Sequence, residues 1–216
     1  MAVAQTTIHV RIPPQELPGE LSIPAHPRGA VIFAHGSGSS RHSPRNQAVA
    51  QALLQAGFAT LLFDLLTEAE AADRNNVFDI ALLGERLVAA IDWIATRPAL
   101  GGQSIGLFGA STGAAAALVA AAQRSDCVHA VVSRGGRPDL AGPFLGRVGT
   151  PTLLIVGGRD ETVLTMNRQA QTRLAGPSRV EVVPGAGHLF EEPGALEAVT
   201  DLARLWFERH LAGVSS

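Results

Sequence analysis

One stretch of the sequence, residues 105–123, places the strongest limit on how the chain can fold. Residues 105–108 form a short apolar segment of the kind that makes a strand buried on both faces of a sheet. Residues 114–122 are mostly alanine and predict a helix with small residues on every face. Between them lies Gly109-Ala110-Ser111-Thr112-Gly113, which matches the pattern G-x-S-x-G. The stretch therefore predicts a sharp strand-to-helix turn with Ser111 at its apex.

A serine at such a turn can be held in a strained backbone conformation that exposes its hydroxyl group, and flanking glycines avoid collisions with the neighbouring strand and helix. The pattern alone is weak evidence, because residues 102–106 (GQSIG) match it as well. Ser104 precedes the predicted strand, where an exposed loop serine is expected, whereas Ser111 follows the strand and opens the helix. We interpret Ser111 as a nucleophile; the alternative is a structural serine at a helix N-cap.

Length and composition favour one globular domain that covers residues 1–216. A formal net charge of −2 argues against a nucleic-acid partner. The single cysteine, Cys127, excludes an intramolecular disulfide framework and a cysteine-based zinc cluster. Neither a secretory leader nor a stretch long enough to cross a bilayer is evident, so a soluble cytoplasmic protein without a membrane partner is expected. No pattern indicates an oligomeric state.

Apolar runs bounded by turn residues predict the strands. They cover residues 6–12, 20–23, 29–34, 58–63, 105–108, 129–133, 151–156 and 179–183. Helical spacing of apolar residues predicts the helices. They cover residues 46–56, 77–96, 114–122, 162–174 and 196–211, with a polar surface loop at 67–76. The first two strands stop at prolines and predict an antiparallel hairpin at one sheet edge. The alternation from residue 29 onward predicts an α/β fold, with a mainly parallel sheet and helices on both faces.

Polar residues follow several of these strands directly. They are His35-Gly36-Ser37, Ser111, Asp160 and His188. In a parallel sheet, ligands bind beyond the carboxyl ends of the strands. We therefore expect these residues to converge at one edge of the sheet although they are far apart in sequence.

The order Ser111, Asp160, His188 supplies a nucleophile, an orienting acid and a general base. A serine hydroxyl is a poor nucleophile at neutral pH and needs a base, whose tautomer a carboxylate can fix. This chain order is the one expected after a G-x-S-x-G turn. Taken singly, Asp160 could be an Asx turn or a helix N-cap, and His188 could be an ordinary loop histidine.

An acyl-transfer site also needs two N–H groups that face the developing oxyanion. The turn predicts one at Thr112, at a helix N-terminus. The Gly/Ser loop after the strand at 29–34 predicts the other at Ser37, with Gly38 as the second choice. Because these donors are backbone atoms, replacement of the Ser37 side chain should matter less than a local change of the backbone.

Three stretches carry a resemblance to a known family. They are residues 35–46 (HGSGSSRHSPRN), 60–67 (TLLFDLLT) and 133–139 (SRGGRPD). The chain resembles α/β-hydrolases and, within that superfamily, the small dienelactone-hydrolase-like group, over essentially its whole length. The resemblance implies an eight-stranded sheet whose first strands are antiparallel to the rest. Dienelactone hydrolases proper use a cysteine in the turn, whereas this chain has Ser111, which favours ester or thioester hydrolysis.

Substrate selection should depend on the loops at the same edge. Many α/β-hydrolases carry a helical lid after the strand that follows the nucleophile, but residues 134–149 are too few for a large one, which predicts an open, shallow site for small acyl groups. The candidate substrate-binding residues are Gly38, Arg41, His42 and Arg134. A guanidinium at Arg41, Arg45 or Arg134 could bind a substrate carboxylate or phosphate. The alternative is structural pairing with Asp64 or Asp139.

The sequence therefore predicts a serine hydrolase that acts on esters or thioesters of small acyl groups through an acyl-enzyme intermediate. No metal and no organic cofactor is expected, and the partner is a small-molecule ester. An acyltransferase or a perhydrolase would use the same triad. A ligand-binding protein that catalyses no reaction is the alternative from a different class.

Overall fold

The strands of the described chain form one continuous sheet. The computed structural model describes residues 5–211, and its strand order is β1-β2-β4-β3-β5-β6-β7-β8. The strands are β1 (Gln5–Ile12), β2 (Leu17–Pro24), β3 (Ala30–Ala34), β4 (Ala59–Phe63), β5 (Ile105–Ala110), β6 (Val128–Arg134), β7 (Thr152–Gly157) and β8 (Ser178–Val183). β2 is antiparallel to β1 and to β4, and all other neighbours are parallel. The predicted mainly parallel sheet with an N-terminal hairpin is confirmed, and β2 alone runs against the other strands.

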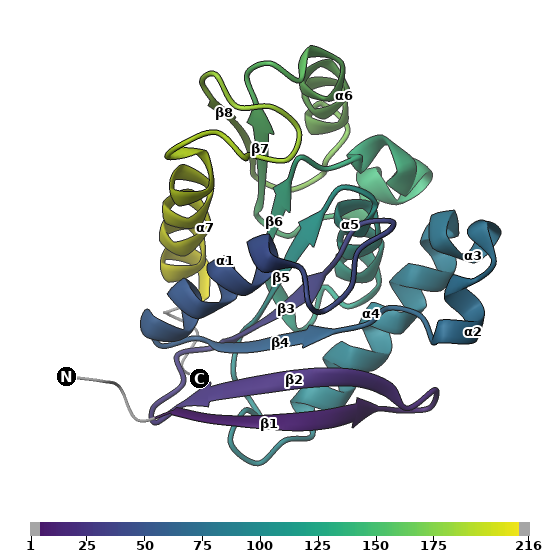
Figure 1. The fold of residues 1–216 in the computed structure, drawn as a ribbon, viewed down its shortest axis with the longest axis vertical. Helices are drawn as coiled ribbons and strands as arrows, with labels where there is room; N and C mark the ends of the chain where they lie inside the picture. Colours follow the sequence, from purple (N-terminus) through teal and green to yellow (C-terminus); the bar gives the residue numbers. More distant parts are fainter. Residues whose placement is uncertain (1–4, 212–216) are drawn as a thin grey trace.

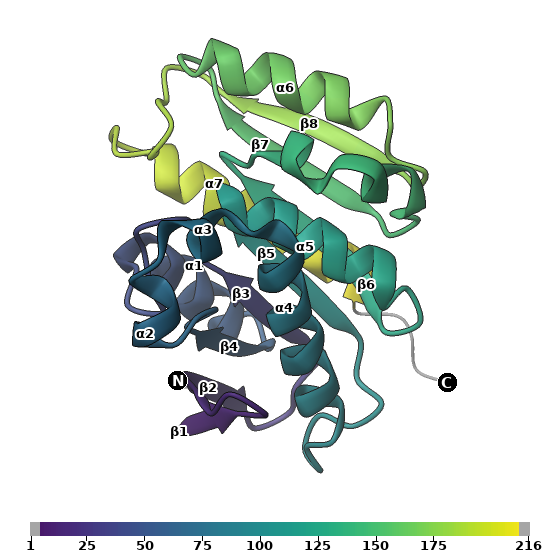
Figure 2. The same cartoon turned by 90° about the vertical axis from the view of Figure 1, so that its right-hand side faces the viewer.

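Helices cover both faces of this sheet. They are α1 (Pro44–Gln55), α2 (Glu68–Ala71), α3 (Arg74–Phe78), α4 (Ile80–Ala95), α5 (Thr112–Gln123), α6 (Glu161–Gln171) and α7 (Ala195–Leu211), with the 3₁₀ segment η1 (Pro138–Arg147). α1 and α7 lie on one face, which is on the left in Figure 1. α4, α5 and α6 lie on the other face, toward the viewer in Figure 2. Short connections between strand and helix keep the carboxyl ends of the parallel strands together at one edge.

The central strand β5 serves the cores on both faces. Leu107 belongs to the buried cluster under α4 and α5, and Phe108 to the cluster under α1 and α7. The Phe108 ring packs against that of Phe33 on β3, with 5.0 Å between ring centroids. Successive side chains of a strand point to opposite faces of the sheet. Because helices cover both faces here, every residue of the strand must be apolar, which explains the unbroken apolar run.

The small residues of α5 allow close packing on several sides. All residues from Thr112 to Ala121 are buried. On the neighbouring helix α4, a Cβ at Gly84 would come within 2.7 Å of Val119 Cγ1 of α5. A helix this enclosed has no room for large side chains, which explains the alanine run in the sequence.

The segment between β4 and α4 differs from the sequence prediction. The predicted polar loop 67–76 contains α2 and the start of α3, which ends at Phe78 inside the predicted helix 77–96, and α4 begins only at Ile80. Thr67 and Glu70 form a capping box at α2, and Asp79 caps α4 by accepting a hydrogen bond from Leu82 N (3.0 Å). α2 and α3 bury none of their own residues, so no apolar periodicity marks them in the sequence.

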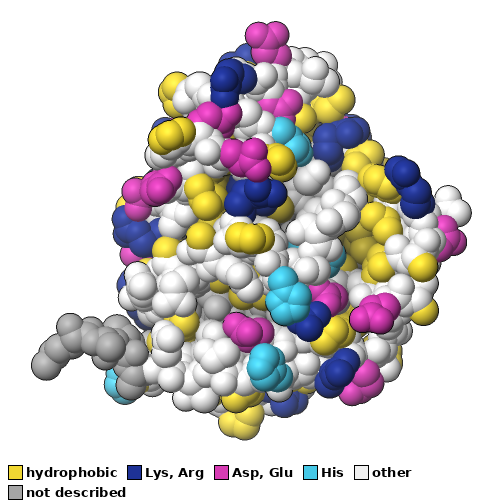
Figure 3. Space-filling model, in the orientation of Figure 1, with side chains coloured by type: hydrophobic (Ala, Val, Ile, Leu, Met, Phe, Trp, Pro, Cys, Tyr) yellow, Lys and Arg dark blue, Asp and Glu magenta, His cyan; other side chains and the backbone are white. Residues whose placement is uncertain are grey.

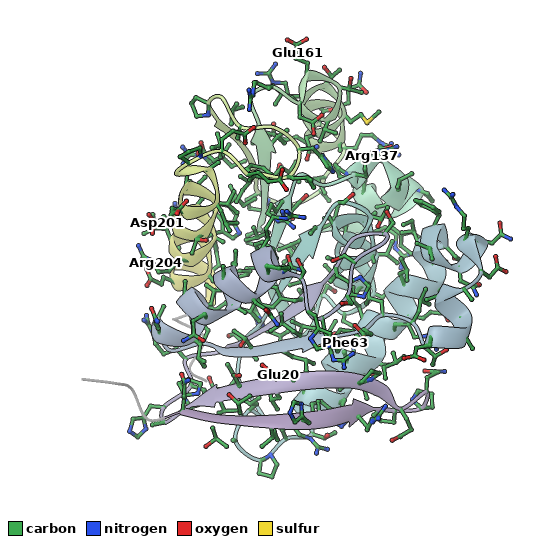
Figure 4. All side chains as sticks on the ribbon, in the orientation of Figure 1. Glu20, Phe63, Arg137, Glu161, Asp201 and Arg204 are labelled. Carbon is green, nitrogen blue, oxygen red and sulfur yellow. The ribbon has the colours of Figure 1, made fainter. Side chains whose placement is uncertain are left out.

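The outer surface of α7 carries charged side chains. Asp201 and Arg204 point away from the sheet in Figure 4, and Arg204 also pairs with Glu208 (3.0 Å). Among the helices of residues 5–211, none combines the length and the hydropathy that crossing a membrane would require.

Candidate active site

Ser111 occupies the predicted sharp turn between β5 and α5. Its backbone has φ 51° and ψ −121°, which is unfavourable for a residue with a side chain. The backbone after β6 fixes this conformation, since Ser111 N donates to Arg134 O (3.2 Å) and Arg137 N donates to Ser111 O (3.1 Å). Figure 4 shows Arg137 beside η1. Ser111 makes no side-chain capping bond among residues 5–211, which argues against the N-cap alternative.

The two glycines of the motif are required by their neighbours. A Cβ at Gly109 would overlap the backbone of Ala114 on α5. A Cβ at Gly113 would overlap the carbonyl oxygens of Ala34 and His35. Both contacts are with backbone atoms that cannot move aside, so the predicted steric reason for the glycines agrees with the structure.

Asp160 and His188 form a hydrogen-bonded pair. His188 Nδ1 lies 2.7 Å from Asp160 Oδ2, and the two side chains are 41% and 17% exposed. Asp160 stands at the N-cap position of α6, yet within the described chain its carboxylate makes no capping bond there. The carboxylate is thus committed to the imidazole, which is the arrangement an orienting acid requires.

The segment after β6 lies against both Ser111 and His188. Arg134 O accepts the hydrogen bond from Ser111 N, and a Cβ at the next residue, Gly135, would lie 3.6 Å from His188 Cε1. Among the hydrogen bonds of residues 5–211, none joins Ser111 Oγ to His188. The structure therefore brings the three predicted residues to one edge of the sheet and pairs two of them directly.

The loop after β3 places Ser37 beside Thr112. Ser37 N donates to Thr112 Oγ1 (2.9 Å), so the two predicted oxyanion residues are in contact. A Cβ at Gly36 would lie 3.0 Å from Ser111 Cβ, which shows how closely this loop approaches the turn. Backbone N–H groups at this position can face a ligand bound above Ser111.

His35 anchors that loop through its side chain. Leu65 N donates to His35 Nε2 (3.1 Å), so Nε2 carries no proton, and Nδ1–H donates to Gly36 O (3.0 Å). Burial lowers the pKa of His35, against smaller opposing effects of Gly36 O and the Asp64 carboxylate. The ring is a neutral structural link between the loops after β3 and β4.

The side chains of three candidate substrate-binding residues do not line a space beside Ser111: those of Arg41, of His42 and of Arg134, whose carbonyl oxygen alone contacts the turn. Arg41 pairs with Asp64 through its side chain and its backbone N (2.7 Å to Oδ1). This is the alternative in which the arginine pairs with Asp64 and does not bind substrate. His42 lines a small surface depression with His9 and Glu20 at the hairpin. Only the fourth candidate, Gly38, lines the cavity described below.

Arg134 is buried under the turn and not exposed beside it. It is 7% exposed, and its Nη2 donates to Asn46 Oδ1 (3.3 Å). Burial lowers the pKa of Arg134 to about 10, and nearby Arg45 adds to the effect. Ion pairs of residues 5–211 join Arg45 to Glu191 and Arg137 to Asp139, and none joins a carboxylate to Arg134. The alternative of structural pairing with Asp64 or Asp139 thus holds for Arg41 and is wrong for Arg45 and Arg134, because Arg41 and Arg137 occupy those carboxylates.

A cavity of about 320 Å³ opens next to Ser37 and Thr112. In Figure 3 it is seen as a hollow with hydrophobic walls on the side where Figure 1 shows α2 and α3. Its lining residues are His35, Gly36, Ser37, Gly38, Ser39, Ser40, Asp64, Leu65, Leu66, Thr67, Glu68, Ala71, Val77, Leu83 and Thr112. The segment 134–149 forms only η1, and α2 and α3 contribute Glu68, Ala71 and Val77 to one wall of the cavity.

Two residues that position the site have no signal in the sequence. Glu192 accepts from Gly187 N (3.0 Å) and pairs with Arg159, so it ties together the residues next to His188 and Asp160. Asn167 is fully buried in α6 and donates to Gly136 O (3.0 Å) in the loop after β6. Within residues 5–211, no group of three or more His, Cys, Asp or Glu side chains has the arrangement of a metal site.

Comparison with known proteins gives a consistent group of relatives. The family model described as "Dienelactone hydrolase family" matches residues 17–211. A solved dienelactone hydrolase from Anabaena variabilis is 52% identical, with a TM-score of 0.92 over 98% of this chain and 100% of that one. An esterase from Pyrococcus furiosus shares the fold at 16% identity, with a TM-score of 0.71 over 97% of this chain and 92% of that one.

A longer relative carries a different name. A Mycobacterium tuberculosis protein named "Putative phosphoribosyl transferase" is 60% identical over 200 residues, which are 93% of this chain. The chain spans 45% of the length of that relative.

Proposed function

The chain belongs to the dienelactone hydrolase family, and from this premise we propose that it is a serine hydrolase that cleaves carboxylic esters or thioesters of small acyl groups. The observation that carries the proposal is the strained Ser111 turn at the same sheet edge as the Asp160–His188 pair, 2.7 Å apart. The only cysteine, Cys127, lies just before β6, at the opposite end of the strands, where it cannot replace Ser111. An oxygen nucleophile is therefore proposed.

In the proposed reaction, Ser111 Oγ attacks the carbonyl carbon of the ester. His188 Nδ1–H donates to Asp160, which leaves Nε2 free to take the proton from Ser111 and then to give it to the leaving alkoxide or thiolate. The products of this half-reaction are the acyl-Ser111 ester and the free alcohol or thiol. Water, activated by His188 in the same way, then hydrolyses the acyl-enzyme and releases the carboxylic acid.

The negative charge on the tetrahedral intermediate would be bound by the backbone N–H groups of Thr112 and Ser37. Ser37 N donates to the Thr112 hydroxyl, and a substrate oxygen would take the place of that hydroxyl as the acceptor. The exchange keeps the N–H group satisfied before and after substrate binding, so forming the oxyanion site leaves no buried donor without a partner.

An acyltransferase or a perhydrolase would form the same acyl-enzyme and differ only in the final acceptor, which is water in our proposal. Phosphoribosyl transfer, which the name of the longer relative mentions, requires groups that bind phosphates. In the described chain the cavity is lined by no arginine or lysine and by two acidic residues, Asp64 and Glu68. This lining favours ester hydrolysis over phosphoribosyl transfer for this chain.

The test is turnover of p-nitrophenyl acetate and butyrate by the wild type and by Ser111→Ala, with labelling by a fluorophosphonate probe. We expect Ser111→Ala to lose about 10³-fold or more in kcat/KM and all labelling, because the nucleophile is removed. Ser104→Ala, at the other G-x-S-x-G match, is the matched control and should keep both; Ser104 is buried (4% exposed) and not the exposed loop serine expected from the sequence. Turnover that survives Ser111→Ala would refute the assignment of the nucleophile.

A further inference from the structure

The cavity beside the turn meets the proposed oxyanion site at one end. Ser37 and Thr112 line it there, while Leu65, Leu66 and Leu83, all buried, form its inner surface. A carbonyl oxygen held by the two N–H groups would therefore lie at the entrance of an apolar space. One of the two remaining substituents of the carbonyl carbon must then point into it.

The position of the general base decides which substituent that is. The leaving group must receive its proton from His188, so it lies on the side of that residue. Neither His188 nor its neighbours Gly187 and Gly135 line the cavity. The substituent that enters the cavity is thus the acyl group, and the leaving group faces His188, which is 41% exposed.

The charges around the cavity select against anionic acyl groups. The Asp64 carboxylate is paired with Arg41, and Glu68 is exposed on α2 at the cavity wall. Within residues 5–211, no arginine or lysine side chain lines the cavity. A second carboxylate on the acyl group would meet Glu68 without a cation to bind it, at a cost in affinity.

The wall formed by α2 and α3 is held in place by polar contacts. Glu70 accepts from Thr67 N (2.9 Å) and pairs with Arg86 of α4 (2.6 Å). Asn76 Nδ2 donates to Glu70 O (3.0 Å), which links α3 to α2. The cavity therefore has a fixed outer limit, which a docked acyl chain would reach.

We propose that this cavity binds the acyl part of the substrate and selects uncharged apolar acyl groups. At about 30 Å³ for each non-hydrogen atom, a volume of about 320 Å³ holds on the order of ten atoms, enough for a hexanoyl, octanoyl or benzoyl group. The acyl group sets the specificity, and the leaving group, bound on the open side, has little influence. This proposal rests on the proposed hydrolase function.

The first experiment fills the cavity from the wall that α2 forms. Ala71 is exposed on α2 and lines the cavity, so Ala71→Phe should fill it without disturbing the core. The matched control is Ala72→Phe, an exposed neighbour that does not line it. With p-nitrophenyl esters we expect Ala71→Phe to reduce kcat/KM for hexanoate at least tenfold and for acetate less than threefold. Equal losses of kcat/KM on both esters would overturn the proposal. It would also be overturned if Ala71→Phe changed only the relative kcat/KM of esters that share one acyl group and differ in the leaving alcohol.

The second experiment changes the charge at the wall. The wild type should prefer the p-nitrophenyl ester of hexanoate over the mono-p-nitrophenyl ester of adipate, whose acyl group carries a carboxylate. In Glu68→Arg this preference should fall at least fivefold, because the substituted side chain attracts the carboxylate. An unchanged ratio would count against selection by charge at this cavity.

A binding measurement separates this proposal from the hydrolase proposal. Hexanamide, an uncharged amide with the same acyl chain, is titrated calorimetrically into Ser111→Ala and into Ser111→Ala combined with Ala71→Phe or Ala72→Phe. If hexanamide binds to Ser111→Ala and to its combination with Ala72→Phe but not to its combination with Ala71→Phe, the acyl cavity is supported even if the wild type hydrolyses no ester. Equal binding by all three proteins overturns it even if ester hydrolysis is observed.

Discussion

Ser111 holds a backbone conformation that costs about 1–3 kcal/mol for a residue with a side chain. Hydrogen bonds at both its N–H and its carbonyl group, to the backbone of residues 134–137, offset this cost. Glycines at 109 and 113 clear the space that the turn needs. The motif and the contact of Gly109 with Ala114 could be read from the sequence because they are local, whereas the contact of Gly113 with residues 34 and 35 and the bonds to residues 134–137 depend on the fold.

The neutral state of His35 predicts a pH dependence of stability. Its pKa is lowered by burial in the folded protein, so between that value and 6.5 the unfolded chain binds more protons than the folded one. The contribution of His35 to stability is present above pH 6.5 and is lost as the pH falls through the lower folded value. We therefore expect the free energy of unfolding, from urea titration, to decrease between pH 7 and pH 5.

The corresponding variant is His35→Gln, with His26→Gln as a control at an exposed position. His35→Gln should weaken the pH dependence, while His26→Gln should leave it as in the wild type. His210 also has a pKa lowered by burial, so part of the slope should remain. A slope that His35→Gln does not alter would show that the ring is not kept neutral by the fold.

At the scale of elements, the proposed acid and base follow different strands and need a common support. Asp160 follows β7 and His188 follows β8, which lie side by side in the sheet. Glu192 joins their loops through Gly187 N and Arg159. The Gly187 hydrogen bond is the main cause of the lowered pKa of Glu192, followed by smaller effects that include Arg159.

Replacement of Glu192 by alanine should therefore affect catalysis more than folding. We expect kcat for p-nitrophenyl acetate to fall about tenfold, since small displacements of catalytic groups cost up to about 10²-fold. Glu191→Ala, which removes a more exposed neighbouring carboxylate, is the control and should stay within about twofold. Steady-state kinetics and thermal unfolding of both variants test this. A loss of kcat that is equal in the two variants would refute a positioning role for Glu192.

The sequence indicated the strands, the hairpin and the residues at the strand ends, because buried apolar runs and their carboxyl ends are local features. It did not indicate α2 and α3, since neither helix buries its own residues. The partners of charged side chains could be predicted only in part. Arg41 pairs with Asp64, which was one of the alternatives, but Arg45 pairs with Glu191, 146 positions away. Such pairs depend on which loops come into contact in the folded chain, and the spacing of residues in the sequence does not predict these contacts.

At the scale of the whole molecule, two buried clusters share the central strands. Leu107 faces one cluster and Phe108 the other, so neither half of the core is complete without β5. The chain has two tryptophans, and each packs against a different cluster: Trp93 of α4 and Trp206 of α7. They provide one fluorescence reporter for each face of the sheet.

The prediction of a single domain can be tested with these reporters. Phe108→Ala should lower the free energy of unfolding by about 3–5 kcal/mol, because a fully buried ring is removed. In a single cooperative domain the same shift appears in Trp93→Phe and Trp206→Phe backgrounds, each of which retains one reporter. A shift seen by Trp206 and not by Trp93 would indicate that the two faces unfold separately.

The wall of the cavity and the proposed reacting groups belong to different stretches of the chain. α2 and α3 lie between β4 and α4, whereas Ser111, Asp160 and His188 follow β5, β7 and β8. On the proposed function, mutations in the short segment that carries α2 and α3 would change which acyl groups are accepted and leave the proposed catalytic residues in place. Related proteins would then differ in the substrates that they accept while they keep the same proposed reaction.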